Sequence, residues 1–183
     1  MFVALTGTPG TGKSTVAKLL QQREYTVLDL HHIAVEQQCI TGVDPQRQSQ
    51  IIDTEKVDAF IKKTYSPQQT LCFIEGHLSH LLSSADKIIL WRCHPMILRS
   101  RLTTRGWNKE KIDENVEAEI LDVILCEALD RHPRDHIFEI DASAMTPEEM
   151  LSCIQDLIDH DFAMRENYKV GCIDWSEELL KDS

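Results

Sequence analysis

The residues with the clearest chemistry lie near the start of the chain, where positions 7 to 14 read GTPGTGKS. This run matches the phosphate-binding pattern G-x-x-x-x-G-K-S/T in full, after an apolar stretch and before a helical pattern. Glycines such as Gly10 and Gly12 let the backbone curl so that several N–H groups face one anion. The following helix start adds its partial positive charge, and the Lys13 ammonium can reach the β- and γ-phosphates. The pattern therefore predicts a nucleoside triphosphate site.

Two hydroxyl groups complete this loop. In phosphate-binding loops, the hydroxyl at the position of Ser14 ligates Mg²⁺, and Thr15 is placed to contact the α-phosphate. The alternative is a glycine-rich turn without a ligand, which the complete motif in its proper context disfavours. The loop therefore predicts ATP and Mg²⁺ as cofactors, and it does not identify the acceptor of the phosphoryl group.

A second group of candidates ends another apolar run, where residues 71 to 77 read LCFIEGH. In P-loop proteins, an acid at such a strand end holds the water shell of the magnesium ion, which makes Glu75 a candidate metal residue acting through water. His77 would face the same side as Glu75 if the strand continued, and it could orient a water or a substrate hydroxyl. The alternatives are a solvated strand-end carboxylate and a histidine without a catalytic role.

A third group is a basic segment after the fourth apolar run. Arg101 and Arg105 are four residues apart and would share one face of a helix. Arginines on a short mobile segment can close over ATP and stabilise the charge that spreads over the transferring phosphoryl group. Arg92 is a weaker candidate for nucleotide contact. The alternative is a solvated basic face that pairs with the acidic residues that follow.

Five β-rich runs alternate with amphipathic stretches, which favours parallel βαβ units with helices on both faces of one sheet. Ligands of such sheets bind beyond the carboxyl ends of the strands, where the loop and Glu75 both stand. The expected strands are residues 2–6, 25–30, 70–75, 87–91 and 136–140. The expected helices are residues 15–22, 54–63, 95–104, 111–131 and 147–161, the last with a capping box at Thr146.

Three segments depart from this alternation. Residues 31–53 are polar with weak periodicity, and residues 104–114 are short and contain Gly106. Both are interpreted as excursions over the carboxyl edge of the sheet. Residues 168–183 are expected to form a loosely attached tail of what is otherwise a single domain spanning 1–183.

Composition restricts the class of partner. The 183 residues carry a formal net charge of −11, which argues against a general nucleic-acid surface because phosphate backbones need a basic footprint. The six cysteines form no C-x-x-C pair, and Cys72 and Cys93 lie in apolar runs as expected for buried thiols. With no long apolar run that could cross a membrane, we expect a soluble, reduced, cytoplasmic protein.

Four stretches taken together resemble the adenylate kinase isoenzyme 6 family, particularly its archaeal branch: residues 7–15, 75–77, 101–107 and 111–119. The resemblance implies a three-layer α/β P-loop NMP-kinase fold, with a five-stranded parallel sheet flanked by helices. It also implies an NMP-binding segment near 30–53 and a short lid near 104–114. The family positions that contact ATP correspond to Gly10, Gly12, Lys13, Ser14, Thr15 and Arg105.

The same resemblance implies an activity. It points to a broad-specificity nucleoside monophosphate kinase that prefers AMP, with an intrinsic ATPase activity. It also implies a role in late maturation of the small ribosomal subunit and its 16S rRNA, through binding of a basic ribosomal protein of the platform. Two alternatives stay open: an ATP-driven assembly factor whose kinase activity is incidental, and a kinase of a small metabolite.

This chain departs from the family pattern at two places. The eukaryotic pattern has aspartate at the position of Glu75, and this longer acid would reach a metal differently. The NMP-binding segment contains one arginine, Arg47, so the groups that would hold the acceptor phosphate are not defined by the sequence.

Overall fold

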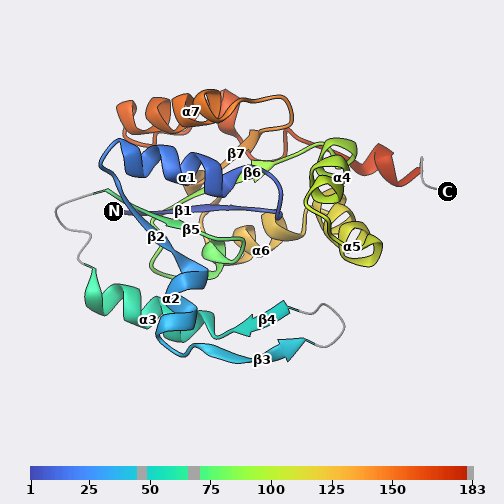
Figure 1. Cartoon of the computed structure of the whole chain (residues 1–183). Coiled ribbons are helices and arrows are strands. Elements are labelled where there is room, and N and C mark those ends of the chain that lie inside the picture. The colour runs from blue at the N-terminus through green and yellow to red at the C-terminus, as the bar shows by residue number, and fades with distance from the viewer. Residues whose placement is uncertain (45–48, 66–70, 181–183) are drawn as a thin grey trace.

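The computed structural model describes residues 1–44, 49–65 and 71–180, and Arg47 therefore lies outside the described residues. Its main sheet has five parallel strands in the order β2-β5-β1-β6-β7, which confirms the predicted sheet (Figure 1). The strands are β1 Phe2–Gly7, β2 Thr26–Asp29, β5 Cys72–Glu75, β6 Lys87–Arg92 and β7 Ile137–Asp141.

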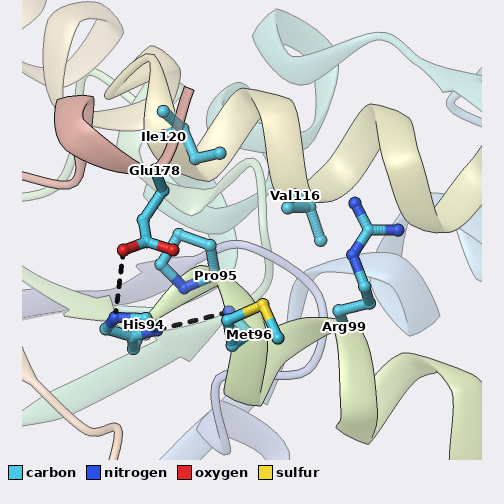
Figure 2. A pocket seen from close by; sticks show the side chains of 7 residues that line it. All are labelled: His94, Pro95, Met96, Arg99, Val116, Ile120 and Glu178. Atoms are coloured by element: carbon cyan, nitrogen blue, oxygen red, sulfur yellow. Dashed lines mark hydrogen bonds and ion pairs between the residues drawn. The ribbon is translucent and has the colours of Figure 1, made fainter. Parts of the chain in front are cut away.

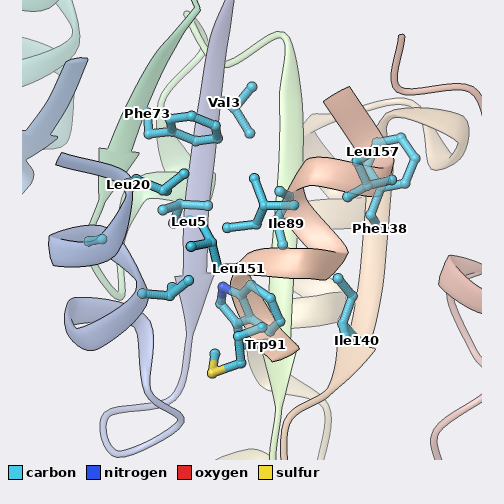
Figure 3. Packing of buried hydrophobic residues seen from close by; sticks show 14 of the residues in the cluster. Val3, Leu5, Leu20, Phe73, Ile89, Trp91, Phe138, Ile140, Leu151 and Leu157 are labelled. Atoms are coloured by element: carbon cyan, nitrogen blue, oxygen red, sulfur yellow. The ribbon is translucent and has the colours of Figure 1, made fainter. Parts of the chain in front are cut away.

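Helices cover both faces of this sheet, and alternate residues of β1 show how. Val3 and Leu5 pack against α1 (Lys13–Gln22) and α7 (Pro147–Asp159), in the cluster drawn in Figure 3. The neighbouring residues of β1 face the other layer. Phe2 packs with α2 (Leu30–Glu36) and α3 (Thr54–Thr64), and Ala4 packs with α6 (Val123–Arg131). Strands buried on both faces are continuous apolar runs, which made them recognisable in the sequence.

The region predicted as one helix over residues 111–131 is two helices, and that prediction is wrong. Helix α5 covers Lys109–Ile120, and α6 begins at Val123 after Asp122, which has a φ of 53°. The carboxylate of Asp122 forms an ion pair with the buried Arg92 guanidinium. The helical region is therefore interrupted at Asp122, where the chain turns so that this carboxylate can pair with Arg92 of β6.

A separate layer stands beside the carboxyl edge of the sheet. Helix α4 (Pro95–Thr104) packs against α5 through apolar side chains such as Leu98 and Val116. Only the turn from Arg105 to Asn108 separates the two helices, and Asn108 caps α5 by accepting from the Lys111 backbone N–H. The predicted lid segment at 104–114 is therefore a short turn followed by the first part of a helix.

The segment predicted as a polar excursion contains regular elements that its sequence did not reveal. Helix α2 begins at Leu30, and its N-cap Asp29 accepts a hydrogen bond from the His32 backbone N–H at 2.9 Å. Strands β3 (Ile40–Asp44) and β4 (Ser49–Ile52) then pair with each other in an antiparallel sheet apart from the main one. In Figure 1 this pair lies below the helices that cover the main sheet.

The C-terminal segment contacts the rest of the fold at several points between Tyr168 and Glu178, which differs from the expectation of a loosely attached tail. The Tyr168 hydroxyl donates to Asp156 of α7 at 2.8 Å, and the Gly171 N–H donates to Glu139 of β7 at 2.7 Å. Trp175 packs on the α4–α5 layer. The sparse apolar residues of this segment are anchored by hydrogen bonds and aromatic contacts, which a hydrophobic pattern does not reveal.

Cys72 and Cys93 are buried, as predicted, and burial raises the pKa of each thiol to about 11. Both therefore stay protonated and unreactive near neutral pH. Within the ranges 1–44, 49–65 and 71–180, no helix combines the length and apolar character that crossing a bilayer requires.

Candidate active site

The phosphate-binding loop is a backbone turn that joins β1 to α1. Gly7 has a φ of 137°, and a Cβ there would lie 2.4 Å from the Trp91 carbonyl oxygen of β6. Gly12, the N-cap of α1, has a φ of 108°, and no side chain caps the first turn of this helix. Both backbone conformations are strained for any residue with a Cβ. The glycines therefore produce an open, positively polarised helix start that suits an anion.

A cavity of about 270 Å³ opens over this loop at the carboxyl edge of the sheet. It brings together candidates from four elements: the loop, the ends of β2 and β5, and the end of α4. Most of the predicted site residues line it. Its walls are Pro9, Gly10, Gly12, Lys13, Ser14, Thr15, Asp29, His31, Glu75, Gly76, His77 and Arg105.

Lys13 is the buried cation of this cavity, with 6% of its surface exposed. Its ammonium donates a hydrogen bond to the Thr8 carbonyl oxygen at 3.0 Å. Burial lowers the pKa of Lys13 to about 8, against the opposing charges of Glu75 and Glu119. The side chain is therefore charged below that pH, and a phosphate would compensate it better than a carbonyl does.

Ser14 and Glu75 meet at the floor of the cavity. The Ser14 hydroxyl donates to a carboxylate oxygen of Glu75 at 2.9 Å. In the sheet, Glu75 is in register with Leu5 of β1 and with Asp29 of β2. Two adjacent oxygen groups beside a phosphate loop are hard ligands of the kind that Mg²⁺ prefers, with waters completing its shell. The residues present therefore fit the metal that the loop motif implies.

His77 lines the same cavity although strand β5 ends at Glu75. Its ring reaches solvent in the cavity, but the surrounding walls and, second, the Lys13 ammonium lower its pKa to about 4. The ring is therefore neutral near pH 7 and presents both a hydrogen-bond donor and an acceptor. Its backbone carbonyl accepts from the Thr6 hydroxyl of β1 at 3.4 Å, which helps to hold this turn.

The arginines predicted from the sequence take different positions. Arg105 ends α4 and reaches the cavity from the turn that leads to α5. Arg101 does not line the cavity; its guanidinium donates to the carbonyls of Ser143 at 3.0 Å and Ala142 at 3.3 Å, and more weakly to Gly10 at 3.5 Å. It thus connects the β7–α7 turn to the phosphate loop.

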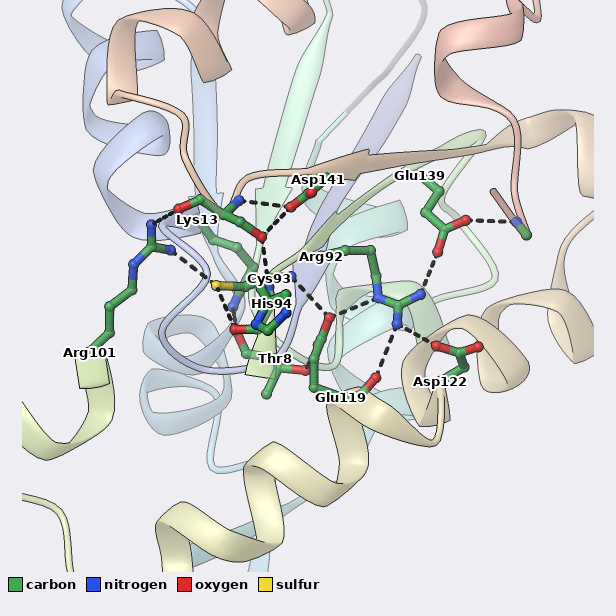
Figure 4. Close-up of polar contacts among 12 residues, drawn as sticks. Thr8, Lys13, Arg92, Cys93, His94, Arg101, Glu119, Asp122, Glu139 and Asp141 are labelled. Carbon is green, nitrogen blue, oxygen red and sulfur yellow. Dashed lines mark hydrogen bonds and ion pairs between the residues drawn. The ribbon is translucent and has the colours of Figure 1, made fainter. Parts of the chain in front are cut away.

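Arg92, the weaker candidate for nucleotide contact, does not line the cavity and points into the interior instead. Its guanidinium is 2% exposed and forms ion pairs with Glu119, Asp122 and Glu139 (Figure 4). A strand-end arginine looks the same in a sequence whether it faces a ligand or a buried acid. The three acids come from parts of the chain that are distant in sequence, so only the fold reveals the pairing.

Two residues that sequence reasoning missed also line the cavity. Asp29 and His31 come from the junction of β2 with α2. The signal that could have identified Asp29 is its place at the end of an apolar run, as for Glu75. His31 belongs to a helix that the sequence analysis did not predict.

Another cavity, of about 390 Å³, lies between α4, α5 and the C-terminal segment (Figure 2). Its walls are largely apolar, and Glu178 of the C-terminal segment forms an ion pair with His94 at 3.7 Å. None of the predicted site residues lines it. It shows how closely the C-terminal segment lies against the helices on either side of the Arg105 turn.

Comparisons with known proteins agree with this geometry. Residues 3–122 match the model of a family described as an AAA domain. A protein of Archaeoglobus fulgidus named "Putative adenylate kinase" is 44% identical over 98% of this chain and 94% of its own length. Proteins of the same name from Pyrococcus abyssi and Methanosarcina barkeri are 40% and 39% identical, over 97% and 96% of this chain and 92% and 97% of their own.

Solved structures share the fold at low sequence identity. Shikimate kinase from Bacteroides thetaiotaomicron superposes with a TM-score of 0.56 at 15% identity, covering 87% of this chain and 98% of that one. The protein TT1252 from Thermus thermophilus gives a TM-score of 0.59 at 18% identity, covering 87% and 97%.

The five-stranded parallel sheet and the glycine loop between β1 and α1 define a P-loop fold, and the archaeal relatives indicate a nucleotide kinase. Within that class, the relatives match nearly the whole chain. The chain belongs to the archaeal family that carries the adenylate kinase name, which is the branch of the adenylate kinase isoenzyme 6 family that its motifs resemble.

Proposed function

We propose that this protein transfers the γ-phosphoryl group of ATP to a nucleoside monophosphate, with AMP as its main acceptor and other monophosphates as slower ones. The observation that carries the proposal is that Lys13, the Ser14–Glu75 pair, Arg105 and His31 all line one cavity. The names of the archaeal relatives support it. His31 lines the same cavity as the loop, and its ring is the group that we propose for contact with the acceptor.

Each residue has a role in this reaction. The backbone of the loop and Lys13 bind the β- and γ-phosphates, and Thr15 contacts the α-phosphate. An acceptor phosphate oxygen attacks the γ-phosphorus, the bond to the β–γ bridging oxygen breaks, and ADP leaves with the electron pair of that bond. The charge spreads over the equatorial oxygens, where Lys13 and Arg105 stabilise it. Arg105 moves with its turn to cover the phosphates and exclude water.

Ser14 would hold Mg²⁺ directly and Glu75 would hold its water shell; the ion supplies positive charge to the β- and γ-phosphates. For the variant Glu75→Gln we expect the Mg²⁺ concentration that gives half-maximal rate to rise about tenfold or more. The matched control is Asp86→Asn, because Asp86 is an acid of the sheet layer that bonds to the Phe2 N–H, away from the cavity. An unchanged Mg²⁺ requirement in Glu75→Gln would remove Glu75 from the metal site.

The decisive test of the proposal is a coupled assay of ADP formation with a panel of monophosphates, namely AMP, CMP, UMP, GMP and dAMP. The rate with AMP should exceed both the rate with the other acceptors and the rate with water alone. Shikimate and homoserine serve as small-metabolite acceptors in the same assay. The proposal is contradicted if no monophosphate raises ADP formation above the rate with water.

A second candidate function is an ATP-driven assembly factor with intrinsic ATPase activity, which binds a basic ribosomal protein of the small-subunit platform during late 16S rRNA maturation. Two observations favour it: the net charge of −11, which suits a basic partner, and the neutral His77 ring, which can orient an attacking water. This candidate function is consistent with the prediction of a cytoplasmic protein that contacts no membrane and no specific nucleic-acid sequence.

This candidate predicts steady phosphate release from ATP without any monophosphate, and capture of the platform protein in a pull-down whose strength depends on ATP. A basic protein of similar charge that is not part of the ribosome is the control. Absence of binding both with and without ATP would contradict the assembly role, and it would leave the kinase proposal untouched.

A further inference from the structure

We propose that Glu119 is a positioning residue of the phosphate loop, because its buried carboxylate holds Thr8 and thereby the part of the loop that Lys13 contacts. This inference rests on the proposed use of the loop as the ATP site.

The geometry begins at the last turn of α5, where Glu119 is 3% exposed. One of its carboxylate oxygens accepts a short hydrogen bond from the hydroxyl of Thr8, which is 2% exposed. The other oxygen accepts from Arg92 Nε at 2.8 Å and from the Cys93 N–H at 3.0 Å. Figure 4 shows the carboxylate between the loop and the end of β6.

Thr8 is contacted from both directions. Its hydroxyl donates to Glu119, and its carbonyl oxygen accepts from the Lys13 ammonium at 3.0 Å. One residue of the loop therefore lies between the anchoring carboxylate and the lysine that is to bind phosphate. When Lys13 leaves the carbonyl for a nucleotide, the hydroxyl bond to Glu119 still holds the loop in its open shape.

Glu119 is itself held in place by Arg92. Arg92 also donates from Nη2 to the Glu119 backbone carbonyl at 3.0 Å, and it forms further ion pairs with Glu139 and Asp122. A buried ion cluster of this kind is weak evidence for added stability, because desolvation of the charges offsets their attraction. What it provides is a fixed direction for the Glu119 carboxylate, as the supporting groups around a binding site do.

Glu119 also joins the loop to the helix that follows the Arg105 turn. Helix α5 begins at Lys109, four residues after Arg105, and ends beside Thr8. The two groups proposed to surround the transferring phosphoryl group, Lys13 and Arg105, are thus both connected to one rigid helix. A change at Glu119 should alter ATP binding although this residue does not line the cavity.

If Glu119 only stabilised the fold, its replacement would lower the melting temperature without a specific loss of ATP affinity. The test therefore measures affinity and thermal stability separately. The probe is a non-hydrolysable ATP analogue with Mg²⁺, titrated by calorimetry without any acceptor, and melting temperatures are recorded alongside. Thr8→Val removes only the hydroxyl and leaves the Glu119–Arg92 pair in place. Thr8→Ser keeps the hydroxyl and is its conservative counterpart.

We expect Thr8→Val and Glu119→Gln each to bind the analogue about tenfold more weakly, which corresponds to about 1.4 kcal/mol. The affinity of Thr8→Ser for the analogue should lie within about twofold of that of the unmodified protein. The affinity of the double variant should be little lower than that of the more weakly binding single variant, because both changes act on the same contact between Thr8 and Glu119.

The matched control is Asp122→Asn, which removes another acidic partner of Arg92 and does not touch the loop. Asparagine accepts the positive φ of this position, so the turn is kept. This variant should change the melting temperature and leave the affinity for the analogue unchanged. The inference is overturned if Thr8→Val binds like the unmodified protein, or if Asp122→Asn weakens binding as much as Glu119→Gln.

The binding test separates this inference from the proposed function. If the unmodified protein binds the analogue and phosphorylates no monophosphate, the kinase proposal fails while the effects of Thr8 and Glu119 on binding can still be measured. If the unmodified protein does not bind the analogue, the assignment of the loop as an ATP site fails, and the inference fails with it.

Discussion

The two sides of the candidate active site are built differently. The donor side is the phosphate loop, which continues a strand in the middle of the main sheet and is held through Thr8 by a buried carboxylate. The proposed acceptor side includes His31 of α2 and leads into β3 and β4. Among the described residues these two strands pair only with each other, and Val43 is 62% exposed. The donor side is thus pre-formed by the core. The proposed acceptor side is anchored through the buried face of α2 and continues into β3 and β4, which contain no fully buried residue.

This difference has a functional meaning for a kinase. A preformed loop can bind the triphosphate with little loss of conformational entropy. A segment attached mainly at its ends can close on the acceptor after it binds, which excludes water from the transfer. We therefore expect changes on the donor side to abolish transfer, and changes on the acceptor side to alter the recognition of one substrate.

The largest expected effect is that of Lys13→Ala. Removing the cation that stabilises the transferring group should lower kcat by about 1,000-fold. The coupled ADP assay with AMP measures it. Lys18→Ala, on the exposed face of the same helix, is the control and should keep full activity. A fall of less than tenfold for Lys13→Ala would contradict the role given to the loop lysine.

The next effect in size is that of Arg105→Ala, for which we expect kcat to fall about 100-fold, since this arginine acts mainly on the charge that develops during transfer. The affinity for the ATP analogue should change much less. Lys109→Ala, an exposed cation at the start of α5, is the matched control. Equal losses in the two variants would mean that only the overall charge of the turn matters.

A smaller effect is expected from pH. The pKa of Lys13 is lowered to about 8 by burial, so this group is charged below that pH and neutral above it. Because the charged form binds phosphate, kcat/KM for ATP should be constant below about pH 8 and fall by about tenfold per pH unit above it. A profile that stays flat to pH 10 would show that the lysine keeps its proton throughout.

The smallest effect is expected on the acceptor side, from His31→Ala. Loss of one hydrogen bond to the acceptor should raise KM for AMP about fivefold and leave the affinity for ATP unchanged. His32→Ala is a close control, because the neighbouring ring pairs with Glu36 on the surface of α2. If His31→Ala weakens ATP and AMP equally, the cavity is not divided into a donor side and an acceptor side.

Much of the fold was predictable from the sequence because its signals are local. The buried strands are apolar runs, and the helices at 54–63 and 95–104 have the expected periodicity and end within about one residue of their predicted bounds. The capping box at Thr146 marked the start of α7, where both of its hydrogen bonds form. The phosphate loop is equally local, since its glycines and the helix start that follows are adjacent in the chain.

The predictions that were wrong concern features that depend on contacts between distant parts of the chain. The break at Asp122, the anchored C-terminal segment and the acids around Arg92 all depend on partners far away in the sequence. Strands β3 and β4 have only half-buried or exposed residues, so their hydrophobic pattern is weak, and α2 is too short for the spacing of Leu30, Ile33 and Ala34 to stand out. Local propensity is too weak to determine the secondary structure of such segments, so tertiary contacts determine it instead.

The sequence by itself determined the phosphate loop, because the glycines, the helix start and the lysine that form it all lie within eight consecutive residues. Only the tertiary structure decided which other groups meet that loop. It brought Glu75, His77 and Arg105 into the cavity, turned Arg92 into the interior, and placed Glu119 against Thr8. The physical reason is that charged side chains take their partners from whatever the fold places beside them, and sequence distance carries little information about that neighbourhood.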